Sequence, residues 1–293
     1  MDYEWRVPSR IAYKGENGKT CTKDEWGFRA TSQMKSYNVT KLLLDNEFAI
    51  QSFDDPITAT TKGPRWLNCP AGKTAVDVCR DYLEHIYQYI ISRLEQTATA
   101  EVLSAIPIEF WFSNSARWSN SVRNTTITAA KQAGFGSRPN DRLYMIPEPE
   151  AAVIATLRHY TSADSAFNVR IGDDVLICDC GSETVETTTY CITSVMPLEF
   201  DKLVVGTGAK CGATSIDLRF HEWMINKFGG FFRDLPFEMK GPGSRFMREF
   251  ELYKNDFTII GGEQGPFELY LVMNGAGPSP YYDAEGKVVR IYP

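Results

Sequence analysis

The sequence predicts an α/β fold with mixed sheets, and three observations lead to that prediction. Helix-type and strand-type patterns alternate along the 293 residues. Segment 73–97 has the spacing of a long amphipathic helix, and segment 174–195 has two strands joined by a tight turn. With 43% hydrophobic residues, the chain is long enough to bury one large core or those of two lobes. The polar segment 161–173 marks the expected boundary, with a first lobe at 1–162 and a second at 163–293.

The first predicted helix is followed by a strand-helix step. Helix 73–97 has apolar side chains at spacings of three and four: Val76, Cys79, Leu83, Ile86, Tyr87, Ile90 and Leu94. A strand at 105–113 then precedes a helix at 119–133. We expect that helix to stop at Gly134, because glycine adopts the left-handed cap conformation easily.

A second step follows the same order. A short strand at Leu143–Ile146 leads through Pro147–Glu150 into a helix at Ala151–His159, since proline and acidic residues suit the first turn of a helix. The remaining predicted elements are the hairpin 174–195, helices at 213–228 and 244–257, and strands at 267–273 and 287–292.

Composition argues against several classes of protein. The net charge is −6 and the charges are dispersed, so we expect no nucleic-acid partner. Seven cysteines without a C-x-x-C pair indicate a reducing, cytoplasmic location. The N-terminal residues do not resemble a signal peptide and no apolar run reaches membrane-spanning length, so no membrane association is expected. Cys178 and Cys180 share one face of a predicted strand, either as small buried hydrophobic residues or as a thiolate pair for a metal.

The hairpin has the layout of a phosphate-binding site. An apolar strand leads to Asp179 and a tight turn, and a polar strand leads away. A turn that grips phosphate needs small residues, so that backbone N–H groups reach the anion. Here Ser182 and Glu183 fill the space after Gly181, and Glu183 would place a carboxylate beside a polyphosphate. The sequence therefore predicts a phosphate hairpin with impaired chemistry.

Five short motifs in order carry a family resemblance: VPSRIAY (7–13), EWGF (25–28), KLLLD (41–45), AAKQAGF (129–135) and PEPEAA (147–152). With the hairpin and the helix opening CGATSID, they resemble the nucleotide-binding domain of the seventy-kilodalton heat-shock chaperone family. That domain belongs to the actin-like ATPase superfamily, with a ribonuclease H-like fold, and the chain is most similar to the divergent branch found in filamentous fungi. The resemblance extends from Val7 to about Ile260.

The resemblance implies two lobes facing a cleft that holds ATP or ADP with Mg²⁺. It places Glu148 near the magnesium-bound water and Asp179 near the metal, and Glu186 replaces the family's second aspartate of this loop. By the same analogy, the residues that contact nucleotide are Gly181 and Thr184 along the phosphates, Gly212 from the second lobe, and Glu251, Lys254 and Thr258 at the adenosine. Alternatively, Glu148, Asp179 and Thr184 only cap turns and helix starts in a retained scaffold.

The chain also departs from the family. The first phosphate loop, D-x-G-T-T, is absent before Val7, which predicts an incomplete first lobe. Thr31 stands where the hydrolytic lysine follows G-F-x-A, and Ser115 replaces the hinge proline, although Arg123 matches a basic residue linked to that hinge. The chain ends at Pro293, before the second adenosine motif. These changes predict weak or absent ATP binding and little hydrolysis.

Three functions fit this sequence. The first is a degenerate chaperone-like nucleotide-binding domain. The second is a non-enzymatic interaction protein on the same scaffold, and the third is a fragment of a larger ATP-dependent chaperone. Elements missing from one lobe would expose sheet edges and apolar patches, so protein partners or self-association are expected.

Overall fold

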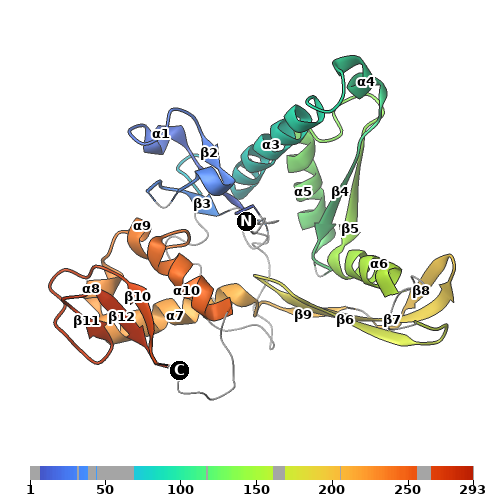
Figure 1. The fold of residues 1–293 in the computed structure, drawn as a ribbon. Helices are drawn as coiled ribbons and strands as arrows, with labels where there is room; N and C mark the ends of the chain where they lie inside the picture. Colours follow the sequence, from blue (N-terminus) through green and yellow to red (C-terminus); the bar gives the residue numbers. More distant parts are fainter. Residues whose placement is uncertain are drawn as a thin grey trace. The chain divides into compact units, whose positions relative to one another are not determined.

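The computed structural model describes residues 7–31, 33–38, 44, 69–116, 118–160, 169–204, 206–255 and 265–292 (Figure 1). The fold is mixed α/β with several sheets, as the sequence predicts. The chain forms two compact units: a terminal unit made of Met1–Asn38 and Arg219–Pro293, and a central unit made of Val39–Leu218. These limits differ from the expected division between residues 162 and 163, and the two-lobed actin-like architecture stays a prediction.

A parallel pair of strands forms one layer of the central unit. Strand β4 (Glu109–Asn114) pairs with β5 (Arg142–Pro147), and helix α5 (Asn120–Gln132) makes the crossover between them. Helix α3 (Ala75–Leu94) packs beside α5 (Figure 1). Because side chains alternate along a strand, one face of this pair packs on the two helices.

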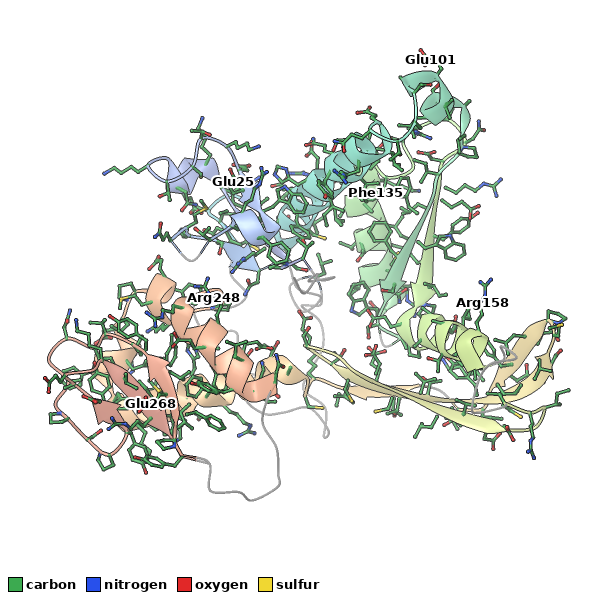
Figure 2. The ribbon with its side chains drawn as sticks, viewed as in Figure 1. Glu25, Glu101, Phe135, Arg158, Arg248 and Glu268 are labelled. Carbon is green, nitrogen blue, oxygen red and sulfur yellow. The ribbon has the colours of Figure 1, made fainter. Side chains whose placement is uncertain are left out.

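The core of this layer is aromatic. Phe135, labelled in Figure 2, packs edge-on against Phe110 and Phe112, with ring centroids 5.0 Å apart in each case. Gly134 has φ +109°, and a Cβ atom there would lie 2.7 Å from the ring of Tyr87. The predicted role of Gly134 as a left-handed helix end is confirmed, and the close approach of Tyr87 is a second reason for glycine.

An antiparallel sheet forms the other layer of the central unit. Its order is β6 (Asp174–Cys180), β7 (Val185–Val195) and β8 (Leu198–Lys202), and β9 (Thr207–Ala209) pairs with β7. Helix α6 (Glu148–Tyr160) packs on one face. The buried contacts between helix and sheet come from Val153, Leu157, Tyr190 and Ile192.

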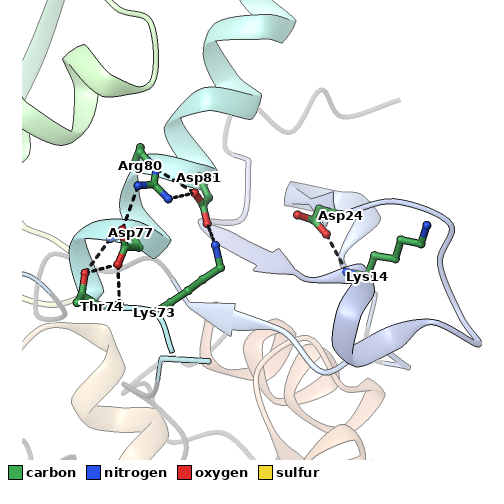
Figure 3. A network of polar contacts seen from close by, with 7 residues as sticks. All are labelled: Lys14, Asp24, Lys73, Thr74, Asp77, Arg80 and Asp81. Carbon is green, nitrogen blue, oxygen red and sulfur yellow. Dashed lines mark hydrogen bonds and ion pairs between the residues drawn. The ribbon is translucent and has the colours of Figure 1, made fainter. Parts of the chain in front are cut away.

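Helix α3 begins at a capping box (Figure 3). The Thr74 hydroxyl accepts from the backbone N–H of Asp77 at 3.2 Å, and the Asp77 carboxylate accepts from the Thr74 N–H at 2.9 Å. Asp81 forms ion pairs with Lys73 at 2.6 Å and with Arg80 at 2.7 Å. The two hydrogen bonds of the capping box satisfy two N–H groups that the helix leaves unpaired. They explain why Gly72-Lys73-Thr74 starts a helix.

The terminal unit contains two small antiparallel sheets, with orders β2-β1-β3 and β10-β12-β11. The elements of its first segment are β1 (Arg10–Ala12), α1 (Lys14–Asn17), β2 (Glu25–Trp26), η1 (Gly27–Arg29) and β3 (Tyr37–Asn38). Those of its second segment are the later part of α7 (Ala213–Phe228), α8 (Gly230–Arg233), α9 (Phe237–Lys240), α10 (Arg245–Asn255), β10 (Phe267–Tyr270), β11 (Tyr282–Asp283) and β12 (Val288–Ile291). The rings of Phe220 and Phe250 stack at 3.9 Å between α7 and α10.

Most predicted elements are present, and several boundaries need correction. Helix α3 ends at Leu94 and strand β10 ends at Tyr270, each three residues before its predicted end. The predicted strand at 105–113 begins only at Glu109, because α4 (Ala100–Ala105) precedes it, with the Thr99 hydroxyl accepting from the Val102 N–H at 3.3 Å. Helix α6 begins at Glu148 rather than at 151, since Pro149 lies in the first turn, where its missing N–H costs nothing. No helix in the described part of the chain is long and apolar enough to cross a membrane.

Candidate functional site

The hairpin predicted at 174–195 is present as β6 and β7, and its turn lies against the start of α7. The Gly181 N–H donates to the Thr184 carbonyl at 2.9 Å, which closes the turn. Three backbone N–H groups at the start of α7 then donate to carbonyl oxygens of the same turn. Gly212 donates to Glu183 at 3.2 Å, Ala213 to Gly181 at 3.2 Å, and Thr214 to Ser182 at 2.7 Å.

These contacts involve the groups that make a helix N-terminus an anion site. The first N–H groups of a helix have no partner within it and point toward the positive end of the helix dipole. In α7, backbone oxygens of the 181–184 turn already accept from three of them. A phosphate at this position would therefore have to displace the hairpin turn.

Gly212 is required for this close approach. A Cβ atom at this position would lie 2.6 Å from the Gly181 carbonyl oxygen and 2.7 Å from backbone atoms of Glu183. Both neighbours are backbone, so neither can move without opening the turn. The structure thus brings Gly181, Thr184 and Gly212 together and joins the turn to α7 through backbone hydrogen bonds, while their contact with phosphate stays a prediction.

Glu186 is the most buried charged side chain near the turn. It lies on the inner face of β7 with 2% of its surface exposed. One carboxylate oxygen accepts from the Ser115 hydroxyl through a short hydrogen bond, and the other accepts from the Ala116 N–H at 3.0 Å. Arg123 donates to the Ala116 carbonyl at 3.4 Å. Glu186 therefore ties β7 to the segment that follows β4.

Asp179 lies directly opposite Glu186 in the β6–β7 register. Opposed residues of an antiparallel pair point to the same face, so the two carboxylates are neighbours, and such like-charged pairs destabilise a sheet by up to about 1 kcal/mol. Asp179 is half-buried. Glu148, the third carboxylate predicted to be catalytic, is the first residue of α6.

The residues expected at the adenosine belong to the terminal unit. Glu251 and Lys254 lie on α10 and form an ion pair at 2.5 Å. Thr258 lies outside the described residues. The Glu251 and Lys254 side chains therefore lie on one face of α10, one turn apart.

Two buried hydroxyl groups were not predicted from the sequence. Thr188 and Tyr190 are each 1% exposed on the inner face of β7, and their hydroxyls have no hydrogen-bond partner among the described residues. Burial raises the pKa of the Tyr190 hydroxyl, and the negative charge of Glu150 raises it further. With Glu186 they form a row of polar side chains under the sheet, which the alternation of β7 places on one face. The alternating polar pattern Glu186, Thr188, Tyr190 was the available signal.

One of the two expectations for the cysteine pair is wrong. Cys178 and Cys180 are both exposed, so they are not small buried hydrophobic residues, and the thiolate pair stays a prediction. Alternation correctly places them on one face of β6, but that face is the outer one, because Val175 and Ile177 take the inner side with Asp179.

No protein-family model matches the chain. A search of curated proteins also gave no match. Among the described residues, no group of three or more His, Cys, Asp or Glu side chains is placed to hold a metal ion.

Proposed function

We propose that this chain is a non-catalytic protein on the nucleotide-binding scaffold of the seventy-kilodalton heat-shock chaperones, and that it binds ATP and ADP weakly or not at all. The ordered sequence motifs support the scaffold. The observation that carries the loss of binding is the set of three hydrogen bonds from the start of α7 to the 181–184 turn.

The size of the effect follows from these three bonds. A hydrogen bond inside a protein contributes about 1 kcal/mol net, so displacing three of them costs a phosphate about 3 kcal/mol. Each 1.4 kcal/mol changes a dissociation constant about tenfold, which gives a loss of roughly 100-fold. Glu183 adds a negative charge on the same turn, so the penalty applies to an anion that is also repelled.

The carboxylates support the same proposal. Mg²⁺ demands near-octahedral oxygen ligands and usually binds through one or two carboxylates and phosphate oxygens. Both oxygens of Glu186 accept from Ser115 and Ala116. A magnesium ion would have to compete with these donors, and Asp179 is left as the accessible ligand of the pair.

Calorimetry with Mg-ATP and Mg-ADP tests the proposal directly. We expect no saturable heat below about 1 mM nucleotide, which corresponds to a binding free energy weaker than about 4 kcal/mol. Phosphate release should equal that of the protein-free blank. An active nucleotide-binding domain of the chaperone family, measured in the same buffer, is the positive control.

A double variant sharpens this test. Thr31→Lys with Glu183→Gly restores two family residues but leaves the three backbone contacts of α7 in place, so we expect it to stay inactive. Saturable micromolar binding by the unmodified chain that Asp179→Asn abolishes would reject the proposal.

A second candidate function, self-association, is favoured by the outer face of β4 and β5. Trp111 is 58% exposed and stacks on Tyr144 with ring centroids 4.4 Å apart. Glu109 and Arg142 are register partners beside them. A second copy turned about a two-fold axis parallel to the strands would set Glu109 over Arg142 and Trp111 over Tyr144, twice, so this face is complementary to itself.

Light scattering over a concentration series tests this candidate. We expect an average mass above the 33.1 kDa monomer that rises with concentration. Trp111→Ser should return the mass to that of a monomer, because aromatic residues dominate interface energies. Tyr89→Ser, which removes an exposed aromatic ring from α3, is the matched control and should leave the association unchanged. A monomer at all concentrations would exclude self-association through this face.

A further inference from the structure

Two thiols lie side by side on the outer face of β6. Cys178 and Cys180 are both exposed, and their Sγ atoms are 3.6 Å apart. Among the described residues, β6 is the outermost strand of its sheet and pairs with β7 alone. The thiols are therefore reachable from solvent and held on the same side of a regular strand.

This geometry disfavours a disulfide. Alternate residues of a strand are about 6.6 Å apart along the chain, at the upper limit of the Cα separation that a disulfide spans. A disulfide also needs its Cβ atoms within about 4.5 Å and its sulfur atoms at about 2.05 Å. Parallel side chains on one strand face do not converge that far, so closing the bond would distort β6.

The same separation suits a single bridging atom. At a metal–sulfur distance of about 2.3 Å, two sulfur atoms 3.6 Å apart subtend an angle of roughly 100° at the metal. That angle is close to tetrahedral, which is the geometry that zinc and related cations prefer with thiolates.

We propose that Cys178 and Cys180 form a two-thiolate site for a thiophilic d¹⁰ cation of the zinc and cadmium class. On binding, two S–H bonds break, two metal–sulfur bonds form and two protons pass to solvent, with no change of oxidation state. Two protein ligands leave the remaining positions to water or small thiols. The bound cation is therefore exchangeable, unlike one in a closed four-ligand site.

Proton release on metal binding sets the pH dependence of this site. The hydrogen bond with Cys180 raises the pKa of the Cys178 thiol, and the negative charges of Cys180 and Asp179 raise it further. A bound cation has the opposite effect on the thiols, because the negative charges that disfavour the thiolates attract the cation. Binding releases protons, so affinity rises with pH.

Cadmium titration of the reduced full chain tests the proposal, with ultraviolet thiolate-to-cadmium absorption as the readout. We expect one equivalent of cadmium to bind per chain. Binding should be about 100-fold weaker in Cys178→Ser and in Cys180→Ser, because a second linked contact raises affinity by at least about that factor. Cys211→Ser removes another exposed thiol and should bind as the unmodified chain does. Circular dichroism confirms that each variant is folded.

Phenylarsine oxide gives an independent measurement, since it bridges two thiols with loss of one water. Mass spectrometry should show one adduct that survives excess glutathione in the unmodified chain and in Cys211→Ser, and none in either single variant of the pair. Retention of the adduct in Cys178→Ser, or equal cadmium affinity in all variants, would overturn the site.

Discussion

Glu186→Ala is expected to lower the free energy of unfolding of the central unit by about 3 kcal/mol. The substitution removes the acceptor of two donors, the buried Ser115 hydroxyl and the half-buried Ala116 N–H. A hydrogen bond to a charged group contributes about 1.5 to 3 kcal/mol, and two such bonds are lost. Relief of the repulsion with Asp179 returns at most about 1 kcal/mol, so the loss dominates. Urea unfolding followed by circular dichroism measures the change.

Two further variants separate the hydrogen bonds from the charge. Glu186→Gln keeps an acceptor for the Ala116 N–H, and its amide donates to the Ser115 oxygen, so we expect a loss of only about 1 kcal/mol. Glu199→Ala removes an exposed carboxylate from β8 of the same sheet and should change stability by less than about 0.5 kcal/mol. If Glu186→Ala behaves like Glu199→Ala, the link from β7 to Ser115 does not stabilise the unit.

The fold was predictable wherever a periodic pattern was long. Helix α7 has the predicted bounds, since its apolar residues repeat over several turns. Helix α4 was missed because its six residues are too few to establish a period, and its cap, Thr99, is a single hydroxyl. Short elements depend on local caps and on the packing of neighbours, which a pattern does not encode.

The candidate site was predictable in its residues but not in its contacts. The order of motifs led to Gly181, Thr184 and Gly212, and the structure places them in one turn and the adjoining helix start. The hydrogen bonds from the start of α7 to the carbonyl groups of the turn depend on the approach of two backbone segments that are distant in sequence. The side of the sheet on which Cys178 and Cys180 lie was equally hidden, because β6 carries apolar residues on both faces.

The second large effect is expected in the terminal unit at acid pH. His221 lies on α7 with 9% of its surface exposed, and its ring packs edge-on against Phe232 at 5.3 Å. Burial lowers the pKa of His221 from 6.5 to about 4, a backbone hydrogen bond with Lys240 opposes this, and the charge of Lys240 lowers it further. The folded state therefore resists protonation more strongly than the unfolded state does.

The sign and size of the pH effect follow from that shift. Between pH 6.5 and about 4 the unfolded chain binds the additional proton, so stability is complete above pH 6.5 and is lost as the pH falls through this window. A shift from 6.5 to about 4 corresponds to a loss of about 3 kcal/mol. Acidic groups elsewhere also titrate here, so the comparison with His221→Gln, which cannot take up the proton, isolates the contribution of this ring.

Amide hydrogen exchange at pH 7 and at pH 4.5 measures that contribution within the terminal unit, because two compact units need not unfold in one transition. Protection of α7 and α10 should fall more steeply with acid in the unmodified chain than in His221→Gln, by roughly 30-fold or more in the opening equilibrium, which corresponds to about 2 kcal/mol. Parallel loss in both proteins would mean that another group controls the acid response. A steeper loss in His221→Gln would contradict the assigned sign. Protonation of the buried His221 imidazole, which lacks solvation, can only destabilise its packing against Phe232.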